Sequence, residues 1–426
     1  MPDIWLPYGR TEVCVRVPSE NFKDEIKTAE MKSSENPRDE IERSIINPID
    51  SRGLSEIVKP GDKVALALNI LNPSISNLIV SIVLSELAQA GLKSGDLTVI
   101  FPQDPFNLKT NEAMERIKND LSPLGVNVVF HDGLSECVYV GETSSGIKMY
   151  VNKIFTDLKV KIIASSVEPN PYMLYSGDGY AVVPGLSNME TISQILMPIL
   201  NIEDPLEALS GSIINDIAEV SHLAKVDFCV NIIRNLKGEV VKSFAGDMEK
   251  SYREAVRLAD ALYKVQVEKK ADAVFASPGG LPFDANLFDS FKCLENSLRV
   301  VRRNGVFVLV AECFEGYGDP DFYRAISRFR DDPLSLEKSL KKRFSVGGFM
   351  AYRFIKASKK FDICMVSAIP DHYAKEKLGL KVFRTANEAL NYALEETGKK
   401  SKVSFIPHGN LTIPIIGGQY AVHEKK

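Results

Sequence analysis

Histidine is scarce in this chain of 426 residues, which contains five of them. Four of the five lie after residue 221, and His131 is the only imidazole before that point. Two imidazoles from the first half of the chain therefore cannot flank a substrate and take up protons on either side of it. This absence excludes any mechanism that needs such a pair of bases.

Cysteine pairs are absent as well. The six cysteines lie far apart, and no C-x-x-C pair occurs. Widely spaced thiols in a large chain are typical of reduced cytoplasmic proteins rather than of disulfide-linked secreted ones. We expect six free thiols, packed mainly as small core residues, and a cytoplasmic location.

The chain has neither a strong charge of one sign nor a long apolar segment. Its formal net charge is -4 at pH 7, which gives no electrostatic attraction to nucleic acid or to an anionic membrane. The longest apolar run, at residues 78–87, is interrupted by Ser81, Ser85 and Glu86, and a membrane span needs roughly 20 apolar residues. The first residues show no basic segment followed by an apolar core, so no signal peptide is expected. We expect neither nucleic acid nor a membrane as a partner.

What the sequence does contain is a regular alternation of strand-like and helix-like segments. A compact apolar segment at residues 63–68 follows a Pro-Gly-Asp turn, as in a buried parallel strand. Helical and strand-like segments then alternate, at 78–90, 96–101, 111–121 and 126–130. This order predicts a parallel, doubly wound sheet.

A second sheet pattern begins at residue 269, directly after a long amphipathic helix predicted at 248–265. We therefore place a junction there and predict two domains, residues 1–266 and residues 267–426. In the second domain we expect helices at 286–303, 334–343 and 386–396, and strands at 305–310, 361–367 and 403–407.

A glycine-rich turn near the middle of the chain carries the most specific signal. Residues 175–185 read Y-S-G-D-G-Y-A-V-V-P-G. This segment resembles the cofactor-attachment turn of the nickel-dependent lactate racemase family, in which a pattern like S-G-G-x-K-A-x-x-P-G carries the cofactor on its Lys. Other segments that fit this family include L-P-Y-G at 6–9, S-P-G-G-L-P-F-D at 277–284 and E-C-F-E-G-Y-G at 312–318. The resemblance implies two α/β domains with mainly parallel sheets that face an interdomain cleft.

The resemblance also implies a set of reactive groups, which this chain replaces. The family is understood to use a nickel-pincer nucleotide joined to a Lys, a His metal ligand, two basic His residues, and Arg or Lys clamps. Carried over to this chain, the attachment Lys becomes Tyr180 and the nickel-ligand His becomes Leu196. One basic His becomes Asn170, and the other falls near residues 104–106, where no His occurs. We therefore predict no nickel-pincer cofactor and no metal site.

The clamp positions differ in the same way. The family loop D-x-T-R-P reads N-I-L-N-P at 69–73, which loses an acid and a guanidinium. In the C-terminal half, Tyr and Gln positions of the family become Phe288 and Asp289, whereas Lys292 matches. The resemblance therefore implies a shared fold and, for most of the reactive groups, different residues.

Four candidate residues lie in the C-terminal half. Gly279 and Gly280 follow a predicted strand and precede a predicted helix, a pattern that can bind an anion. Lys292, in that helix, either contacts a ligand carboxylate or phosphate or is an exposed helix Lys. Asp289, one turn earlier, either carries a proton or simply pairs with Lys292.

The other candidates lie in the N-terminal half. Tyr180 is either a proton donor or ligand contact, or a half-buried aromatic that replaced an unused tether. Asn69 and Asn72 follow the carboxyl end of a strand, where α/β sheets usually bind ligands, although the same amides are typical of turns beside Pro73. Asn170 is a further ligand contact that the resemblance suggests. His131 ends a strand and is expected to form a turn.

These observations lead to one functional hypothesis and two alternatives. We expect a divergent member of the family that binds a small anionic metabolite of the hydroxy-acid type in the cleft. If it is an enzyme, its reaction would be isomerisation at a hydroxy-acid carbon, with Lys292 holding the anion and Tyr180 or Asp289 carrying the proton. The first alternative is a binding or regulatory homologue without catalysis. The second is a true 2-hydroxy-acid racemase or epimerase with an unusual cofactor attachment.

Overall fold

A computed structural model describes residues 1–70, 72–107, 111–133, 135–204, 206, 216, 219 and 222–417 of the chain. Position 71, inside the predicted 69–73 loop, and His423 lie outside these residues. The chain divides into two compact units, one made of Met1–Ala29 with Leu262–Lys426 and the other of Glu30–Ala261. Each unit is built on one six-stranded sheet.

The first residues of the chain lie in the same unit as its C-terminal part, whereas the sequence analysis places them in domain 1–266. The reason is strand pairing. Strand β3 (Phe22–Glu25) pairs in parallel with β19 (Val403–Ile406) and so joins the sheet of the C-terminal part. A terminal strand that pairs far along the chain leaves no local sequence signal. The predicted cleft between the domains stays a prediction.

The sheet of the unit Glu30–Ala261 has the order β13-β12-β9-β4-β5-β6. Its strands are parallel except β13, which pairs antiparallel with β12 across a tight turn. The predicted α/β alternation and the mainly parallel sheet are therefore confirmed. The strands are β4 (Val64–Asn69), β5 (Leu97–Phe101), β6 (Asn127–Phe130), β9 (Val160–Ser166), β12 (Phe228–Arg234) and β13 (Val240–Gly246).

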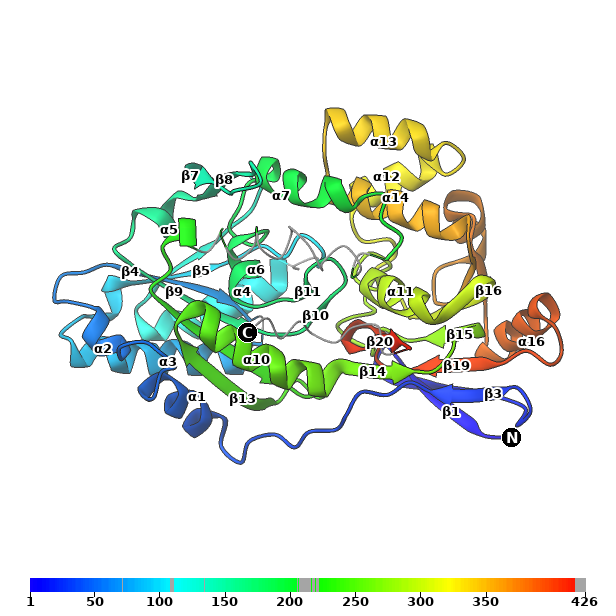
Figure 1. Cartoon of the computed structure of the whole chain (residues 1–426), viewed down its shortest axis with the longest axis horizontal. Coiled ribbons are helices and arrows are strands. Elements are labelled where there is room, and N and C mark those ends of the chain that lie inside the picture. The colour runs from blue at the N-terminus through cyan, green and yellow to red at the C-terminus, as the bar shows by residue number, and fades with distance from the viewer. Residues whose placement is uncertain are drawn as a thin grey trace. The chain divides into compact units, whose positions relative to one another are not determined.

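Helices cover both faces of this sheet (Figure 1). One face buries an apolar core that includes Leu66, Ile162 and Val230 against helix α3 and its neighbours. The strand period of two sends the alternate residues to the other face, toward α6. The elements beside the sheet are α1 (Pro37–Ile46), α2 (Leu54–Ile57), α3 (Pro73–Gln89), α4 (Asn111–Leu121), β7 (Cys137–Glu142), β8 (Lys148–Asn152), α5 (Lys153–Asp157), β10 (Pro169–Asn170), β11 (Leu174–Tyr175), α6 (Asp178–Val182), α7 (Met189–Leu196) and α10 (Met248–Tyr263).

Strand order fixes where this sheet can bind a ligand. From β4 the chain continues to β5 and β6 on one side, and then returns to β9 and β12 on the other side of β4. The carboxyl ends of β4 and β9 are therefore the topological switch point, the place where open α/β sheets leave a crevice for ligands.

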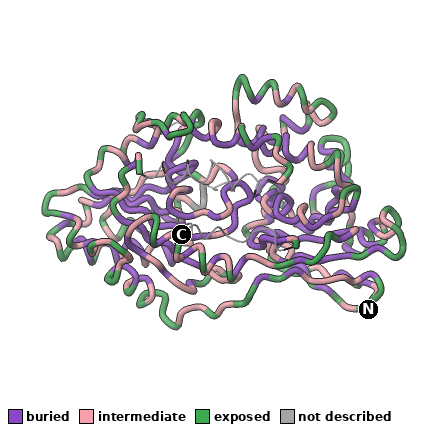
Figure 2. Tube along the Cα trace, viewed as in Figure 1, coloured by how far each residue is buried: buried purple, intermediate pink, exposed green. Residues whose placement is uncertain are grey.

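The sheet of the other unit has the order β18-β17-β16-β15-β19-β3 and is parallel throughout. Figure 2 shows that its strands are largely buried, as continuous apolar strands of a parallel sheet should be. Its elements are β1 (Asp3–Tyr8), β2 (Thr11–Arg16), β14 (Lys264–Val267), β15 (Ala271–Ala276), α11 (Phe291–Ser297), β16 (Val301–Val310), α12 (Pro320–Phe329), α13 (Pro333–Lys342), α14 (Val346–Ser358), β17 (Asp362–Val366), α15 (Asp371–Tyr373), β18 (Lys381–Phe383), α16 (Ala386–Thr397) and β20 (Ile413–Ile416).

One predicted helix is shorter than the sequence suggests. The prediction placed a helix at 286–303, but α11 begins at Phe291 and β16 begins at Val301. Two backbone hydrogen bonds explain the late start, because Leu287 donates to Gly316 O (3.0 Å) and Phe288 donates to Tyr317 O (3.3 Å). These bonds tie the segment to a distant loop and draw it out of helical geometry.

The six cysteines all carry free thiols, and four of them are buried. Among the helices that the structure describes, none combines the length and the apolar character needed to cross a membrane.

Candidate functional site

Polar side chains form a row across the middle of the sheet in the unit Glu30–Ala261. Asn69 at the end of β4 lies in register with Ser165 on β9, and Ser165 lies in register with Asn231 on β12. Residues in register on parallel strands point to the same face, and this is the face opposite the apolar core. Asn69 is half-buried, whereas the other two are fully buried. The predicted ligand contact Asn69 therefore stands at the switch point.

Asn72, the second predicted amide of this region, caps helix α3. Its Oδ1 accepts a hydrogen bond from the backbone N of Ile75 at 3.2 Å. Asn is among the preferred N-cap residues because this bond satisfies a helix donor that otherwise has no partner. Of the two roles that the sequence left open for Asn72, its hydrogen bond matches the local turn contact rather than a ligand contact.

Tyr180 lies in α6, inside the turn that resembles the attachment site. Its side chain is 3% exposed, and its hydroxyl donates to Asp104 Oδ1 at 2.6 Å. Burial, and then the charge of Asp104, raise the pKa of Tyr180 well above its ordinary value. The phenol is therefore a neutral hydrogen-bond donor at any physiological pH.

Asn170 lies beside this pair, and its amide lowers the pKa of Tyr180 slightly against the larger opposing effects. Its Oδ1 accepts from the backbone N of Tyr172 at 2.9 Å. Its Nδ2 is buried and makes no hydrogen bond of normal geometry within the part of the chain that the structure describes. A buried amide donor without a hydrogen bond of normal geometry can serve an acceptor on a ligand.

Leu196 and His131 both make contacts that give them structural roles. Leu196, at the end of α7, is 1% exposed and packs as an apolar core residue. His131 is buried, with Nδ1 2.9 Å from Asn152 Nδ2 and Nε2 3.3 Å from Ser187 O. Because a carbonyl only accepts, Nε2 donates to Ser187 and Nδ1 accepts from Asn152. The imidazole is held as a neutral structural group.

In the C-terminal part, the predicted glycines allow a close backbone contact. Gly280 has a φ of 73°, and a Cβ there would lie 2.8 Å from Gly9 O. Leu281 N donates to the same Gly9 O at 2.9 Å, so the β1–β2 turn is packed directly on this loop. A Cβ on Gly279 would lie 3.1 Å from His408 Nδ1.

The glycine loop does not open directly into a helix, because α11 begins only at Phe291. Lys292 is therefore in the first turn of a short helix, and it is half-buried. Asp289 is buried and accepts from Asn286 Nδ2 at 2.8 Å. The sequence predicts a helix N-terminus beside the glycines that could bind an anion, but α11 begins too late in the chain to provide one there.

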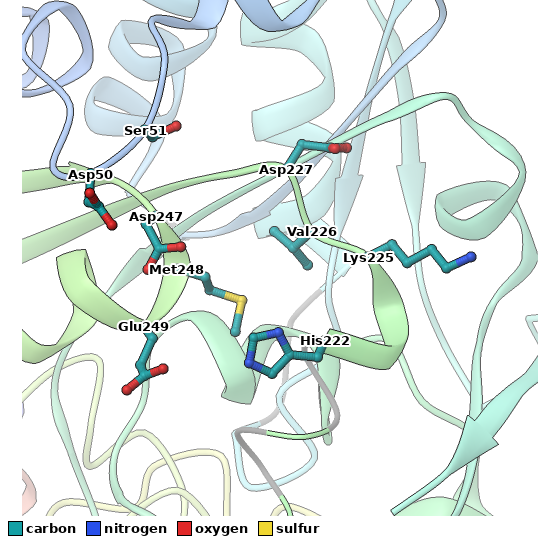
Figure 3. Close-up of a pocket in the computed structure, with 9 residues that line it drawn as sticks. All are labelled: Asp50, Ser51, His222, Lys225, Val226, Asp227, Asp247, Met248 and Glu249. Carbon is teal, nitrogen blue, oxygen red and sulfur yellow. The ribbon is translucent and has the colours of Figure 1, made fainter.

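A separate polar pocket of about 210 Å³ lies at the amino end of β12 (Figure 3). It is rich in ionisable groups, and Lys250 neutralises one of them through its ion pair with Asp50. None of the predicted site residues lines it. Its lining residues are Asp50, Ser51, His222, Lys225, Val226, Asp227, Asp247, Met248 and Glu249.

Sequence reasoning missed one residue of the attachment turn. Asp178, at the start of α6, is 1% exposed and touches Asn231 of the polar row. A carboxylate between glycines in an otherwise apolar turn was the signal that could have drawn attention to it. Across the described residues, no group of three or more His, Cys, Asp or Glu side chains is arranged to hold a metal ion.

Two mainly parallel sheets flanked by helices define an α/β protein, and comparison with known families identifies which one. The lactate racemase N-terminal domain family matches residues 8–201, and the lactate racemase C-terminal domain family matches residues 266–413. The chain therefore belongs to the lactate racemase family, as the sequence resemblance indicated.

Two lactate racemases align with this chain over nearly its full length. The chain is 23% identical over 423 residues to a lactate racemase of Thermoanaerobacterium thermosaccharolyticum, covering 96% of this chain and 98% of that protein. It is 21% identical over 420 residues to a lactate racemase of Lactiplantibacillus plantarum, covering 96% and 99%.

Solved structures show the same fold. The lactate racemase apoprotein from T. thermosaccharolyticum superposes with a TM-score of 0.85 at 23% identity, covering 97% of this chain and all (100%) of that one. A protein from Thermotoga maritima gives a TM-score of 0.62 at 16% identity, covering 91% and 100%.

Proposed function

We propose that this lactate racemase-like protein binds a small anionic metabolite of the hydroxy-acid type without a Lys-linked nickel-pincer nucleotide. The observation that carries the proposal is Tyr180, a buried phenol at the position where the family pattern has the attachment Lys. A phenol offers no amine for the linkage. Its hydroxyl is already engaged with Asp104.

The position of the nickel-ligand His supports the same proposal. Leu196 is buried and has no lone pair to donate to a metal. The residues at these two positions therefore do not fit the family cofactor. We derive no step of the chemistry through it.

Asn170 and Asn69 offer polar groups for an anionic ligand. The buried Nδ2 of Asn170 lacks a hydrogen bond of normal geometry within the described residues, and half-buried Asn69 stands at the end of β4. Amide N–H groups can donate to a carboxylate or to a hydroxyl oxygen. We propose that these two amides hold the ligand. Lys292 as carboxylate clamp, and Gly279, Gly280, Asn72 and Asp289 as further contacts, stay predictions.

Whether binding leads to catalysis depends on a group that exchanges a proton near neutral pH. The raised pKa of Tyr180 opposes that role, because its proton is held by burial and by Asp104. This observation favours the alternative function, a binding or regulatory homologue without catalysis. If the protein is an isomerase, Asp289 stays the predicted proton carrier.

The cofactor part of the proposal is tested by intact mass and nickel analysis of protein produced together with the cofactor-making enzymes. We expect an unmodified mass and no stoichiometric nickel for the wild type. A Tyr180→Lys variant is the matched comparison, because it restores an amine at that position. A covalent adduct with nickel in the wild type would overturn the proposal.

The ligand part is tested by calorimetric titration with a panel of hydroxy acids and sugar acids. Each acid is paired with its uncharged amide. We expect at least one acid to bind, its amide to bind more weakly, and Asn170→Ala to weaken binding. If chiral chromatography detects racemisation of a bound acid, the protein is an enzyme. Binding without turnover would support a binding or regulatory homologue without catalysis.

A further inference from the structure

A buried carboxylate in the turn at residues 175–185 has no cationic side chain acting on it among the described residues. Asp178 is 1% exposed, and its Oδ2 accepts from Asn231 Nδ2 at 2.8 Å. The same Nδ2 also donates to Ser251 Oγ at 3.2 Å. These contacts hold Asp178 over the polar row of the sheet, in the unit Glu30–Ala261.

Three buried oxygens of these residues make no hydrogen bond of normal geometry within the described part of the chain. They are Asp178 Oδ1, Asn231 Oδ1 and Ser165 Oγ. Ser165 and Asn231 are in register on adjacent strands β9 and β12, and Asn231 holds Asp178, so the three residues are neighbours. Both Ser165 and Asn231 are fully buried. Buried acceptors without partners are rare, and several together indicate that something else satisfies them.

The groups that act on Asp178 include no cationic side chain among the described residues. Burial is the largest influence and, with the charge of Asp247, raises the pKa of Asp178 to about 7, whereas hydrogen bonds from Asn231 and from the Cys229 thiol lower that pKa. A buried ionised carboxylate is costly unless it is paired, so it takes up either a proton or a cation. A water molecule could satisfy the oxygens but would leave the charge uncompensated.

We propose that Asp178, Asn231 and Ser165 form a binding site for a monovalent alkali cation, Na⁺ or K⁺. One carboxylate with neutral oxygens matches a single positive charge, whereas Ca²⁺ sites usually gather several carboxylates. The nearby Cys229 does not suit a soft metal, because burial raises the pKa of its thiol well above the ordinary value and keeps it protonated. The site stabilises the attachment turn and is independent of the hydroxy-acid ligand.

The first test compares melting temperatures in NaCl, KCl and choline chloride at equal ionic strength. At pH 8 we expect Na⁺ or K⁺ to raise Tm by about 2–4 °C over choline. At pH 5.5 the difference should shrink, because a proton then neutralises Asp178. Asp178→Asn should abolish the cation effect, and Ser165→Ala should reduce it.

Two matched variants control for the substitutions themselves. Asp120→Asn changes an exposed carboxylate in the same unit, and Ser404→Ala removes another buried hydroxyl without a partner, in the other unit. Both should keep the full cation effect. Equal Tm values in all three salts would overturn the proposal and assign a proton to Asp178.

A direct measurement covers the case in which Asp178→Asn fails to fold. Crystals of the wild-type protein soaked in thallium(I) acetate should show an anomalous peak among Asp178 Oδ1, Asn231 Oδ1 and Ser165 Oγ. The absence of a peak there would overturn the proposal. Neither experiment involves a hydroxy acid or nickel, so a failure here is distinguishable from a failure of the proposed function.

Discussion

At the scale of single residues, Tyr180 in the turn at residues 175–185 takes part in a hydrogen-bond network with the loop after β5. Buried Tyr180 and half-buried Asp104 satisfy each other through a hydrogen bond of 2.6 Å. Asp104 also accepts from the backbone N of Phe106 at 3.0 Å, so the carboxylate orders the loop after β5. The Tyr180 phenol is therefore part of a local network.

Removing the Tyr180 hydroxyl tests that network. Tyr180→Phe should lower the free energy of unfolding by about 1–3 kcal/mol, because it removes the hydrogen bond from a buried phenol to a half-buried carboxylate. Urea denaturation followed by circular dichroism measures the change. Tyr139→Phe is the control, since Tyr139 is 55% exposed and should change stability little. An equal effect of the two substitutions would contradict the assigned role.

At the scale of elements, helix α11 is fixed to α14 by a buried ion pair. Arg353 Nε and Nη2 donate to the two carboxylate oxygens of Glu295, each at 2.8 Å. The two side chains are only 7% and 6% exposed. This bidentate contact holds the short helix that carries Lys292.

Removing one partner of this ion pair should lower the free energy of unfolding strongly. Glu295→Gln should cost about 3–5 kcal/mol in unfolding free energy, because it leaves the Arg353 guanidinium buried without its counter-charge. Asp321→Asn breaks an exposed pair with Arg324 in the same unit and should cost less than about 1 kcal/mol. Guanidinium chloride denaturation of both variants compares them, and similar losses would argue against a strongly coupled buried pair.

The contact between the β1–β2 turn and the glycine loop gives a second prediction at this scale. Gly280→Ala would place a Cβ 2.8 Å from Gly9 O at a φ of 73°, so it should suffer both strain and a clash with backbone. Gly316→Ala has a similar φ of 80° with no atom within 4 Å of the added Cβ, so it should suffer strain alone. We expect Gly316→Ala to cost about 1–2 kcal/mol and Gly280→Ala at least about 1 kcal/mol more. Thermal denaturation compares the two variants, and equal melting temperatures would contradict the contact.

At the scale of the whole molecule, Asp178 makes stability depend on pH. Its pKa rises from an ordinary 3.8 to about 7 in the folded protein, so the folded state binds the proton more tightly than the unfolded state. The resulting stabilisation is fully present below pH 4 and is lost as the pH rises toward 7. The groups that face Asp178 are Asn231 and Cys229 on β12, Asp247 before α10, and Tyr252 within α10.

The expected size of this effect is on the order of 4 kcal/mol between pH 4 and pH 8, from about three pKa units. It should appear in choline chloride and weaken in NaCl or KCl. Urea denaturation of wild type and Asp178→Asn at a series of pH values measures it. If Asp178→Asn keeps the same fall in stability, another group is responsible.

The alternation of strands and helices was readable from sequence because each buried strand and amphipathic helix has its own period. Strand β4 and helix α4 follow that local signal closely. The start of α11 was not readable, since hydrogen bonds from residues 287 and 288 to the loop at 316–317 decide it. The pairing of β3 with β19 was not readable for the same reason.

The sequence by itself determined the family and the layered fold, because these depend on local patterns and residue types. Only the tertiary structure decided what individual side chains contact. It joined Tyr180 to Asp104 and placed Asp178 against Asn231 and Ser165, residues that come from separate strands. Burial and charge act through space, and the order of residues along the chain does not specify which of them will meet.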